Sequence, residues 1–173
     1  MTQTQKDRDA LREWAVFYES GLRRQNSDVN LTQAQIAKDR TRLEADPIEW
    51  IRFFFPEYCK FEFAEFQIKA IRRCIKHEEW FEVLSWARGL AKSTTVMFIV
   101  IYLALTKKKC NVMMASATQD SAVRLLDPYK KQLEENALIR AYYGVQVNLG
   151  NWCAEEFVAK CGCSFRAVGA GNA

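Results

Sequence analysis

One stretch, residues 80–105, restricts the possible folds of this chain more than any other part of the sequence. It begins as an apolar strand at Trp80, passes through a short turn, and continues as a helix that contains the longest apolar run, Val96 to Leu105. A run of about ten apolar residues is too short to span a bilayer, so such a helix has to be covered by protein on all sides. The stretch predicts a strand followed by a core helix, with no membrane role.

The turn between this strand and this helix ends in Lys92-Ser93. Backbone N–H groups in such a turn point at anionic oxygens, and the start of the helix adds its partial positive charge. A lysine there supplies a full charge for the outer phosphates of a nucleotide, and a neighbouring hydroxyl can ligate Mg²⁺. The sequence therefore predicts a phosphate site, with Lys92 on the phosphates and Ser93, aided by Thr94, on the metal ion.

The turn fits the phosphate-loop pattern G-x-x-x-x-G-K-[ST] only in part. The two glycine positions of the pattern hold Trp86 and Ala91, and Gly89 falls between them. Ala91 is small enough to let a phosphate approach, but alanine adopts a positive φ less readily than glycine does. A glycine-containing turn that happens to carry Lys-Ser is the alternative reading. The strand before the turn and the helix after it favour a phosphate loop.

The eight residues Ala87-Arg88-Gly89-Leu90-Ala91-Lys92-Ser93-Thr94 resemble the variant Walker A loop of the large terminase subunit of tailed bacteriophages. That family is the ATP-driven motor that packs double-stranded DNA into procapsids. Its loop usually carries an arginine four residues before the lysine, where Arg88 stands, and often lacks the first glycine of the standard motif. The resemblance implies that Arg88 senses or stabilises the γ-phosphate, and that Gly89, Leu90 and Ala91 complete the nucleotide-binding loop.

A second segment of the same resemblance lies upstream, in a helix predicted over residues 64–75. Its buried side is expected to carry Phe66, Ala70, Ile71 and Ile75, and Gln67 lies near its start. In terminases and related helicase-like motors, a Phe-x-x-Phe-Gln kind of segment before the Walker A loop holds the adenine. A glutamine amide can pair with both a donor and an acceptor on the edge of adenine. The resemblance therefore implies that Gln67 binds the base.

The N-terminal part of the chain predicts three helices. The first, over residues 4–25, has an apolar stripe, and Thr32-x-x-Gln35 reads as a capping box that opens a second helix to about Ala45. Their mixed charge favours a solvated face over an arm that docks on DNA or on another subunit. Asp46-Pro47 then starts a short aromatic helix over residues 48–55, whose rings we expect to pack onto the core.

The C-terminal part predicts strands as well as helices. The expected elements are a strand over 111–115, a helix opened by Ser116-Ala-Thr-Gln119 and kinked at Pro128, a helical segment over 133–144, and a hairpin of 151–159 with 164–168 around Cys161-Gly162.

The net charge of +4 permits contact with nucleic acid without arguing for it. The six cysteines lack the spacing of a disulfide scaffold or a zinc site, so we expect free thiols.

A P-loop ATPase also needs an apolar strand that ends in Asp-Glu, which holds Mg²⁺ and orients water. The nearest match, Leu125-Leu126-Asp127, lies inside a helical pattern and precedes a proline. In terminases the Walker B strand follows shortly after the segment that residues 164–171 resemble, and a nuclease domain lies further on. We therefore interpret residues 47–173 as the N-terminal portion of a P-loop ATPase domain, without Walker B strand or nuclease domain, and residues 1–46 as a helical arm.

The resemblance implies an α/β P-loop NTPase fold of the additional-strand, RecA-like type, with a parallel core sheet that is incomplete at the C-terminus. It implies ATP and Mg²⁺ as cofactors, and ATP hydrolysis coupled to translocation of double-stranded phage DNA. The implied partners are the portal protein, the small terminase subunit and further copies in a ring, in the host cytoplasm on the procapsid and not in the mature virion.

Two alternatives stay open at this stage. One is a helicase-like P-loop ATPase of mobile-element origin, and the other is a fragment that binds nucleotide or mediates assembly without hydrolysis. The missing Asp-Glu pair favours the second alternative for this chain. We expect residues 1–173 alone to bind nucleotide weakly and to show no meaningful ATP turnover, because no carboxylate completes the metal shell.

Overall fold

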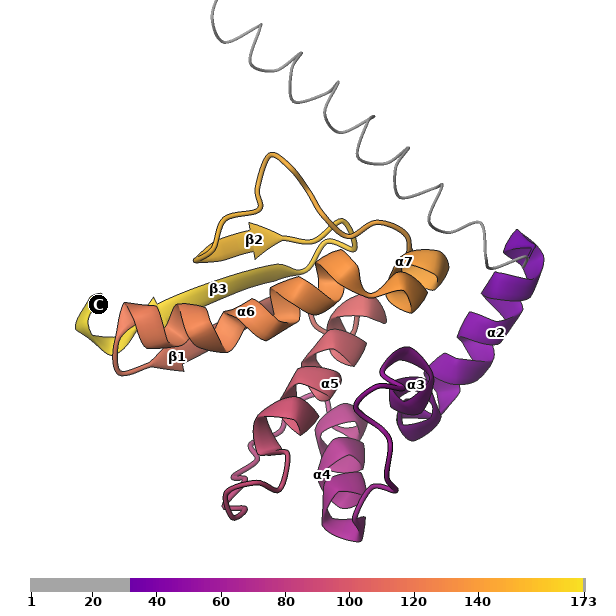
Figure 1. Cartoon of the computed structure of the whole chain (residues 1–173), viewed down its shortest axis with the longest axis horizontal. Helices are drawn as coiled ribbons and strands as arrows, with labels where there is room; N and C mark the ends of the chain where they lie inside the picture. Colours follow the sequence, from indigo (N-terminus) through magenta and orange to yellow (C-terminus); the bar gives the residue numbers. More distant parts are fainter. Residues whose placement is uncertain (1–31, 173) are drawn as a thin grey trace, which may run out of the picture.

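A computed structural model describes residues 32–172 as an α/β fold of helices and a small sheet (Figure 1). The helix predicted over residues 4–25 lies outside the described residues. In chain order the elements are α2 (Gln33–Ala45), α3 (Pro47–Phe54), α4 (Glu65–Lys76), α5 (Lys92–Leu105), β1 (Asn111–Ser116), α6 (Gln119–Glu135), α7 (Ala137–Tyr143), β2 (Glu156–Val158), β3 (Ser164–Gly169) and the 3₁₀ turn η2 (Ala170–Asn172).

The sheet has three strands in the order β1-β3-β2 and is mixed rather than parallel throughout. β1 runs parallel to β3, beginning with the pair Asn111 and Ser164, and β2 pairs antiparallel with β3. The predicted hairpin is confirmed, with Gly162 at a φ of +95° in its turn, but its first strand covers only Glu156–Val158. In Figure 1 the arrows of β1 and β3 point the same way, and α6 lies along the sheet.

Helix α5 joins the sheet to the N-terminal helices. It contacts α3 and α4 as well as α6, and Figure 1 shows it standing between these two groups. Most of the apolar run of α5 is buried, including Phe98, Ile101 and Tyr102, each no more than 2% exposed. The prediction of a core helix is therefore confirmed, but its cover is incomplete, since Val96, Val100 and Leu103 along one face stay partly exposed.

The aromatic side chains of α3 form the centre of the core, as predicted. Trp50, Phe54 and Phe55 are at most 1% exposed, and the Trp50 ring meets that of Tyr102 edge-on at 5.1 Å. The Trp50 Nε1–H donates to Tyr143 Oη at 2.8 Å, so the buried indole has a hydrogen-bond partner. Buried aromatic rings that also satisfy their polar atoms fix the packing of neighbouring helices. Here they anchor α3 against α5 and α7.

Local capping signals set most helix starts. Thr32 caps α2 with Gln35 in a complete capping box, and the Asp46 carboxylate accepts from the backbone N–H at the start of α3, both as predicted. Helix α6 instead begins at Gln119 with Thr118 as its cap, later than the predicted opening at Ser116. Ser116 belongs to β1, because its backbone pairs with β3. Pro128 lies inside α6, which is continuous through it.

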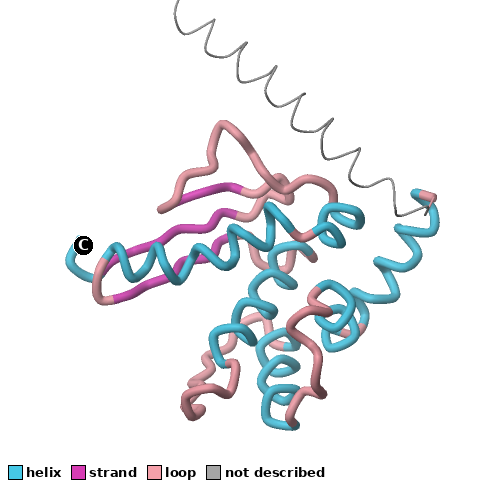
Figure 2. Tube along the Cα trace, in the orientation of Figure 1, coloured by secondary structure: helices cyan, strands magenta, loops and turns pink. Residues whose placement is uncertain are grey.

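Two predictions about the region before the phosphate loop are wrong. The stretch from Trp80 to Trp86 forms no strand, and Figure 2 draws it as loop. It is extended with alternating exposure, yet none of the described strands pairs with it, and a strand requires a backbone partner. Phe66 was expected on the buried side of α4 but is 38% exposed, because its ring rests on Trp86 at 4.8 Å rather than in the core.

Candidate phosphate-binding site

The residues directly before α5 form a turn that contains two positive φ angles. Gly89 has a φ of +88°, and Ala91 lies in the left-handed region at φ 53° and ψ 31°. Successive N–H groups in such conformations make a concave anion site, and the left-handed residue sits where the standard motif has glycine. The turn thus contains two residues of positive φ, and one of them is an alanine where the standard motif has glycine.

The start of α5 leaves donors available to this turn. No side chain caps the helix, although the Ala91 carbonyl accepts from both the backbone N–H and the hydroxyl of Thr95, at 2.9 Å each. The first N–H groups of a helix have no intrahelical partner, and they carry the positive end of the helix dipole. An anion at this end would therefore find donors that the described side chains leave free.

The predicted phosphate and metal ligands lie together at this helix start. Lys92 and Ser93 are exposed and Thr94 is half-buried. The Lys92 Nζ makes only a long hydrogen bond of 3.4 Å, to the Trp86 carbonyl, so the ammonium can turn towards an anion at little loss. Arg88 is also exposed on the same turn. Two cationic and two hydroxyl side chains thus belong to this turn and the first turn of α5.

Gln67 reaches this turn from α4. Its Nε2 donates to the Leu90 carbonyl at 3.3 Å, while its Oε1 accepts from the Ala64 backbone N–H at 2.9 Å. The structure therefore brings Gln67 beside the loop, 23 residues away in sequence. Both ends of its amide are engaged with the protein in this arrangement. Pairing with adenine would require exchanging one of these two bonds, and the longer one to Leu90 is the weaker.

A cleft of about 580 Å³ opens beside the loop, between α5, α6 and β1. Its wall includes Lys92, Ser93 and Thr94 but not Arg88 or Gln67. The residues that the sequence did not point to are Tyr58, Val96, Met97, Met114, Arg124, Leu125, Pro128 and Tyr129. The cleft therefore joins a mostly apolar floor to a cationic rim, a combination that suits an anion with an organic body.

Among the cleft residues that the sequence analysis did not single out, Arg124 is the most informative. It is exposed on α6, where a lone arginine on a solvated helix face gives no sequence signal. Its presence in the same wall as Lys92 puts a second positive charge into the lining of the cleft. Only the packing of α6 on β1 creates this neighbourhood, since the two residues are 32 positions apart in the sequence.

Carboxylates are absent from the described lining of this cleft. Asp127, the nearest match to a Walker B aspartate, lies within α6 and pairs with Lys131 at 3.0 Å on the helix surface. Within residues 32–172 no group of three His, Cys, Asp or Glu side chains is placed to hold a metal ion. The described lining of the cleft offers cationic and hydroxyl side chains, but not the acidic group that ATP hydrolysis requires.

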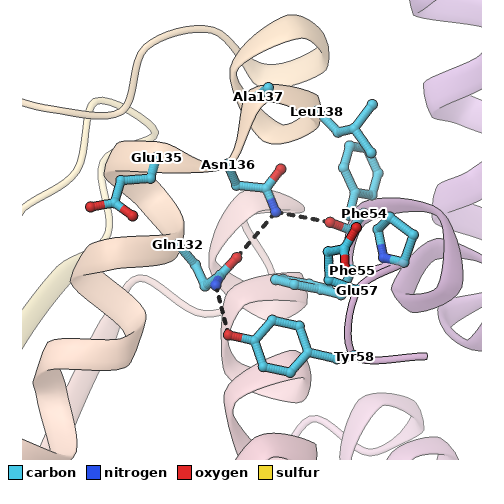
Figure 3. Close-up of a pocket in the computed structure, with 10 residues that line it drawn as sticks. Phe54, Phe55, Glu57, Tyr58, Gln132, Glu135, Asn136, Ala137 and Leu138 are labelled. Carbon is cyan, nitrogen blue, oxygen red and sulfur yellow. Dashed lines mark hydrogen bonds between the residues drawn. The ribbon is translucent and has the colours of Figure 1, made fainter. Parts of the chain in front are cut away.

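A second cavity, of about 330 Å³, lies where α3, α6 and α7 meet (Figure 3). Its amides bond to one another and to the backbone: Asn136 Nδ2 donates to the Phe54 carbonyl at 2.8 Å and to Gln132 Oε1 at 3.1 Å. Gln132 Nε2 in turn donates to Tyr58 Oη at 3.1 Å. These hydrogen bonds connect the segments that surround the cavity. Its polar side chains are therefore already used to hold the helices together.

Comparison with known proteins adds no assignment. No family model matches this chain, and neither the curated proteins nor the solved structures include one with significant similarity. None of the helices within the described residues is both long and apolar enough to cross a membrane. Any functional argument therefore rests on the loop geometry and on the motif resemblance.

Proposed function

We propose that this chain binds a nucleoside triphosphate with Mg²⁺ at the loop of residues 87–94, as the ATP-binding part of a DNA-packaging motor of the large-terminase type. One observation carries the proposal: a left-handed residue stands directly before Lys92-Ser93 at the uncapped start of the buried helix α5. That combination of backbone shape, free donors and charge is what a triphosphate requires.

Each loop residue has a role that its position allows. Lys92 holds the outer phosphates as a compact charge, and the hydroxyl of Ser93, aided by Thr94, ligates Mg²⁺ when the nucleotide is bound. Arg88 neutralises the terminal phosphate from the same turn. Gln67, already at hydrogen-bond distance from the loop, contacts the base. Gly89 and the left-handed residue before Lys92 keep the backbone close enough to donate.

The motor assignment rests on the sequence resemblance. It includes ATP hydrolysis, translocation of double-stranded DNA, a homo-oligomeric ring, the portal protein and small subunit as partners, a location in the host cytoplasm, and an additional-strand P-loop fold. The mixed α/β architecture supports that fold at the level of class, and the helicase-like alternative shares it.

A second candidate function is nucleotide binding without turnover by residues 1–173. The observation that favours it is the cleft lining, which offers Lys92, Ser93 and Arg124 but no carboxylate among the described residues. Phosphate release from Mg²⁺–ATP, measured on the purified chain, separates the two. Release that Lys92→Ala abolishes assigns hydrolysis to this loop, whereas binding without release supports the second candidate.

Titration of a fluorescent ATP analogue in the presence of Mg²⁺ tests the site. Lys92→Ala removes a charge-assisted contact of about 1.5–3 kcal/mol, so affinity should fall by roughly ten- to a hundred-fold or become unmeasurable. Lys76→Ala is the matched control, because Lys76 is an exposed helical lysine on α4. Equal affinity in the Lys92 variant and the unmodified chain would remove the phosphate-site assignment.

A further inference from the structure

Three of the six cysteines gather at one corner of the sheet. Cys110 immediately precedes β1, and Cys161 and Cys163 flank the glycine in the turn between β2 and β3. All six cysteines are free thiols in the structure, as predicted. This corner lies at the starts of β1 and β3, whereas the phosphate loop precedes α5, so the cluster is independent of the proposed nucleotide site.

The β1–β3 strand register begins one residue after two of these cysteines, Cys110 and Cys163. The first pair of the parallel ladder is Asn111 with Ser164, and the Ser164 N–H donates to the Cys110 carbonyl at 2.8 Å. Directly opposite residues share a face, since the Ser164 hydroxyl meets Asn111 Oδ1 at 2.6 Å. The Cys163 carbonyl still accepts from the Ala159 N–H at 2.9 Å, so its backbone continues the strand.

Cys110 and Cys163 each directly precede the first pair of the ladder, so extending its register by one residue sets them opposite each other. Neighbouring strands lie about 4.8 Å apart, and a disulfide needs Cα atoms roughly 4.4–6.8 Å apart. By strand alternation both side chains lie on the face of Val112 and Phe165, which is the face opposite that of Asn111 and Ser164. Continued at this register, the backbone would bring the two Cα atoms within the range that a disulfide requires.

The two thiols differ in access and in reactivity. Cys110 is exposed, whereas Cys163 is 1% exposed. Burial first, and then the neighbouring Cys161 and Cys110, raise the pKa of the Cys163 thiol to about 12, which is consistent with the three sulfur atoms being close together. An oxidant from solvent therefore reaches Cys110 first, and Cys163 is protected from direct oxidation.

We propose that Cys110 and Cys163 are a modification site that a peroxide converts into a reversible disulfide across the start of the β1–β3 ladder. The Cys110 sulfur attacks hydrogen peroxide, giving a sulfenic acid and one water. The Cys163 sulfur then attacks the Cys110 sulfur, the S–OH bond breaks, and the hydroxyl leaves with the thiol proton as a second water. Two thiols lose two electrons and the peroxide gains them, and an added thiol reverses the reaction by exchange.

Such a bond would join the start of β1 to the start of β3 and close a long loop that contains α6, α7 and β2. Crosslinks across long loops restrict the unfolded chain most, so the oxidised protein should melt at a higher temperature, by roughly 5–15 °C. The reduced protein keeps the present fold, in which all six thiols are free. The corner would then act as a stability switch that responds to peroxide.

Peptide mapping tests the proposal directly. The reduced chain is treated with a few equivalents of hydrogen peroxide, alkylated without reductant and digested with trypsin, which cleaves after Lys109, Arg124, Lys160 and Arg166. The expected product is the peptide 110–124 joined to the peptide 161–166, lost on adding dithiothreitol. The joined peptide should form in Cys161→Ser, so that the bond is assigned to Cys163, and should disappear in Cys110→Ser and Cys163→Ala.

Cys153→Ser is the matched control, because Cys153 is exposed like Cys110 and lies outside the ladder. That variant should keep both the joined peptide and the rise in melting temperature. Cys110→Ser changes an exposed side chain, so it reports on the bond even where Cys163→Ala unfolds the core. Persistence of the joined peptide in Cys163→Ala, its loss in Cys161→Ser, or oxidation of the unmodified chain without any joined peptide would each overturn the proposal.

Discussion

Replacing Ala91 by glycine should make the protein more stable, although glycine loses more conformational freedom on folding than alanine does. Ala91 has a φ of 53° and a ψ of 31° immediately before α5. In that left-handed region the alanine Cβ crowds the following carbonyl, which costs about 1–2 kcal/mol for an L-residue. Glycine has no Cβ and adopts the same conformation freely. The side chain is exposed, so its removal sacrifices little packing.

Two opposing terms set the size of the effect. Relief of the left-handed strain gains about 1–2 kcal/mol, while the greater freedom of glycine in the unfolded chain loses about 0.5–1 kcal/mol. The net gain is therefore about 0.5–1 kcal/mol in the free energy of unfolding. In a chain of this size such a gain raises the melting temperature by roughly 1–4 °C. Nucleotide affinity should be kept or improved, because the loop backbone relaxes towards the standard motif.

Urea denaturation and thermal melting of three variants measure this prediction. Ala87→Gly is the matched control, since Ala87 is exposed in the same turn and is not among the residues of positive φ. It should lose about 0.5–1 kcal/mol, whereas Lys107→Gly should gain stability because Lys107 has a φ of 59° after α5. If Ala91→Gly lost as much stability as Ala87→Gly, the left-handed assignment would be refuted. Loss of nucleotide binding would show that the turn is not a phosphate loop.

Three further predictions concern the fold. Gly169→Ala should destabilise by about 1–3 kcal/mol in urea melts, because its Cβ would lie 2.3 Å from the Gln119 backbone nitrogen; Gly150→Ala, with open space around it, should change little. Asn136→Ala should cost about 1–2 kcal/mol by the same assay, since Asn136 caps α7 and donates to the Phe54 carbonyl at 2.8 Å. Burial raises the pKa of Tyr129 to about 12, so the stability that its neutral form provides is complete below about pH 10 and is lost between about pH 10 and 12. Tyr129→Phe should flatten the fall in melting temperature over that range, and an unchanged profile would contradict this cause.

Much of the local structure could be predicted from the sequence, because its causes lie within a few residues. Thr32 and Asp46 cap their helices with side chains that reach only two or three positions along the chain. The turn at Gly162 requires a positive φ that glycine supplies, which is why the hairpin was predictable. The run from Val96 had to be buried whatever its neighbours are.

The predictions that failed depend on distant partners. Trp80 to Trp86 has the alternation of a strand, but a strand exists only where a second backbone lies beside it, and none of the described strands does. Phe66 has the spacing of a buried residue, yet its ring lies on Trp86 instead of in the core. In both cases the spacing of apolar residues is that of the predicted element. What the sequence does not show is which other segment lies beside it, and that segment determines whether a strand or a buried face forms.

The same division holds for the candidate site. The sequence by itself determined the loop, its two cationic side chains and its hydroxyls, because a turn of eight residues positions its own backbone and side chains. Only the tertiary structure decided that Gln67 bonds to Leu90, that Arg124 shares a cleft wall with Lys92, and that Cys110 and Cys163 both stand next to the first pair of the β1–β3 ladder. Those neighbours come from helix packing and strand register, which depend on the combined burial of residues far apart in the chain and leave no signature at any one of them.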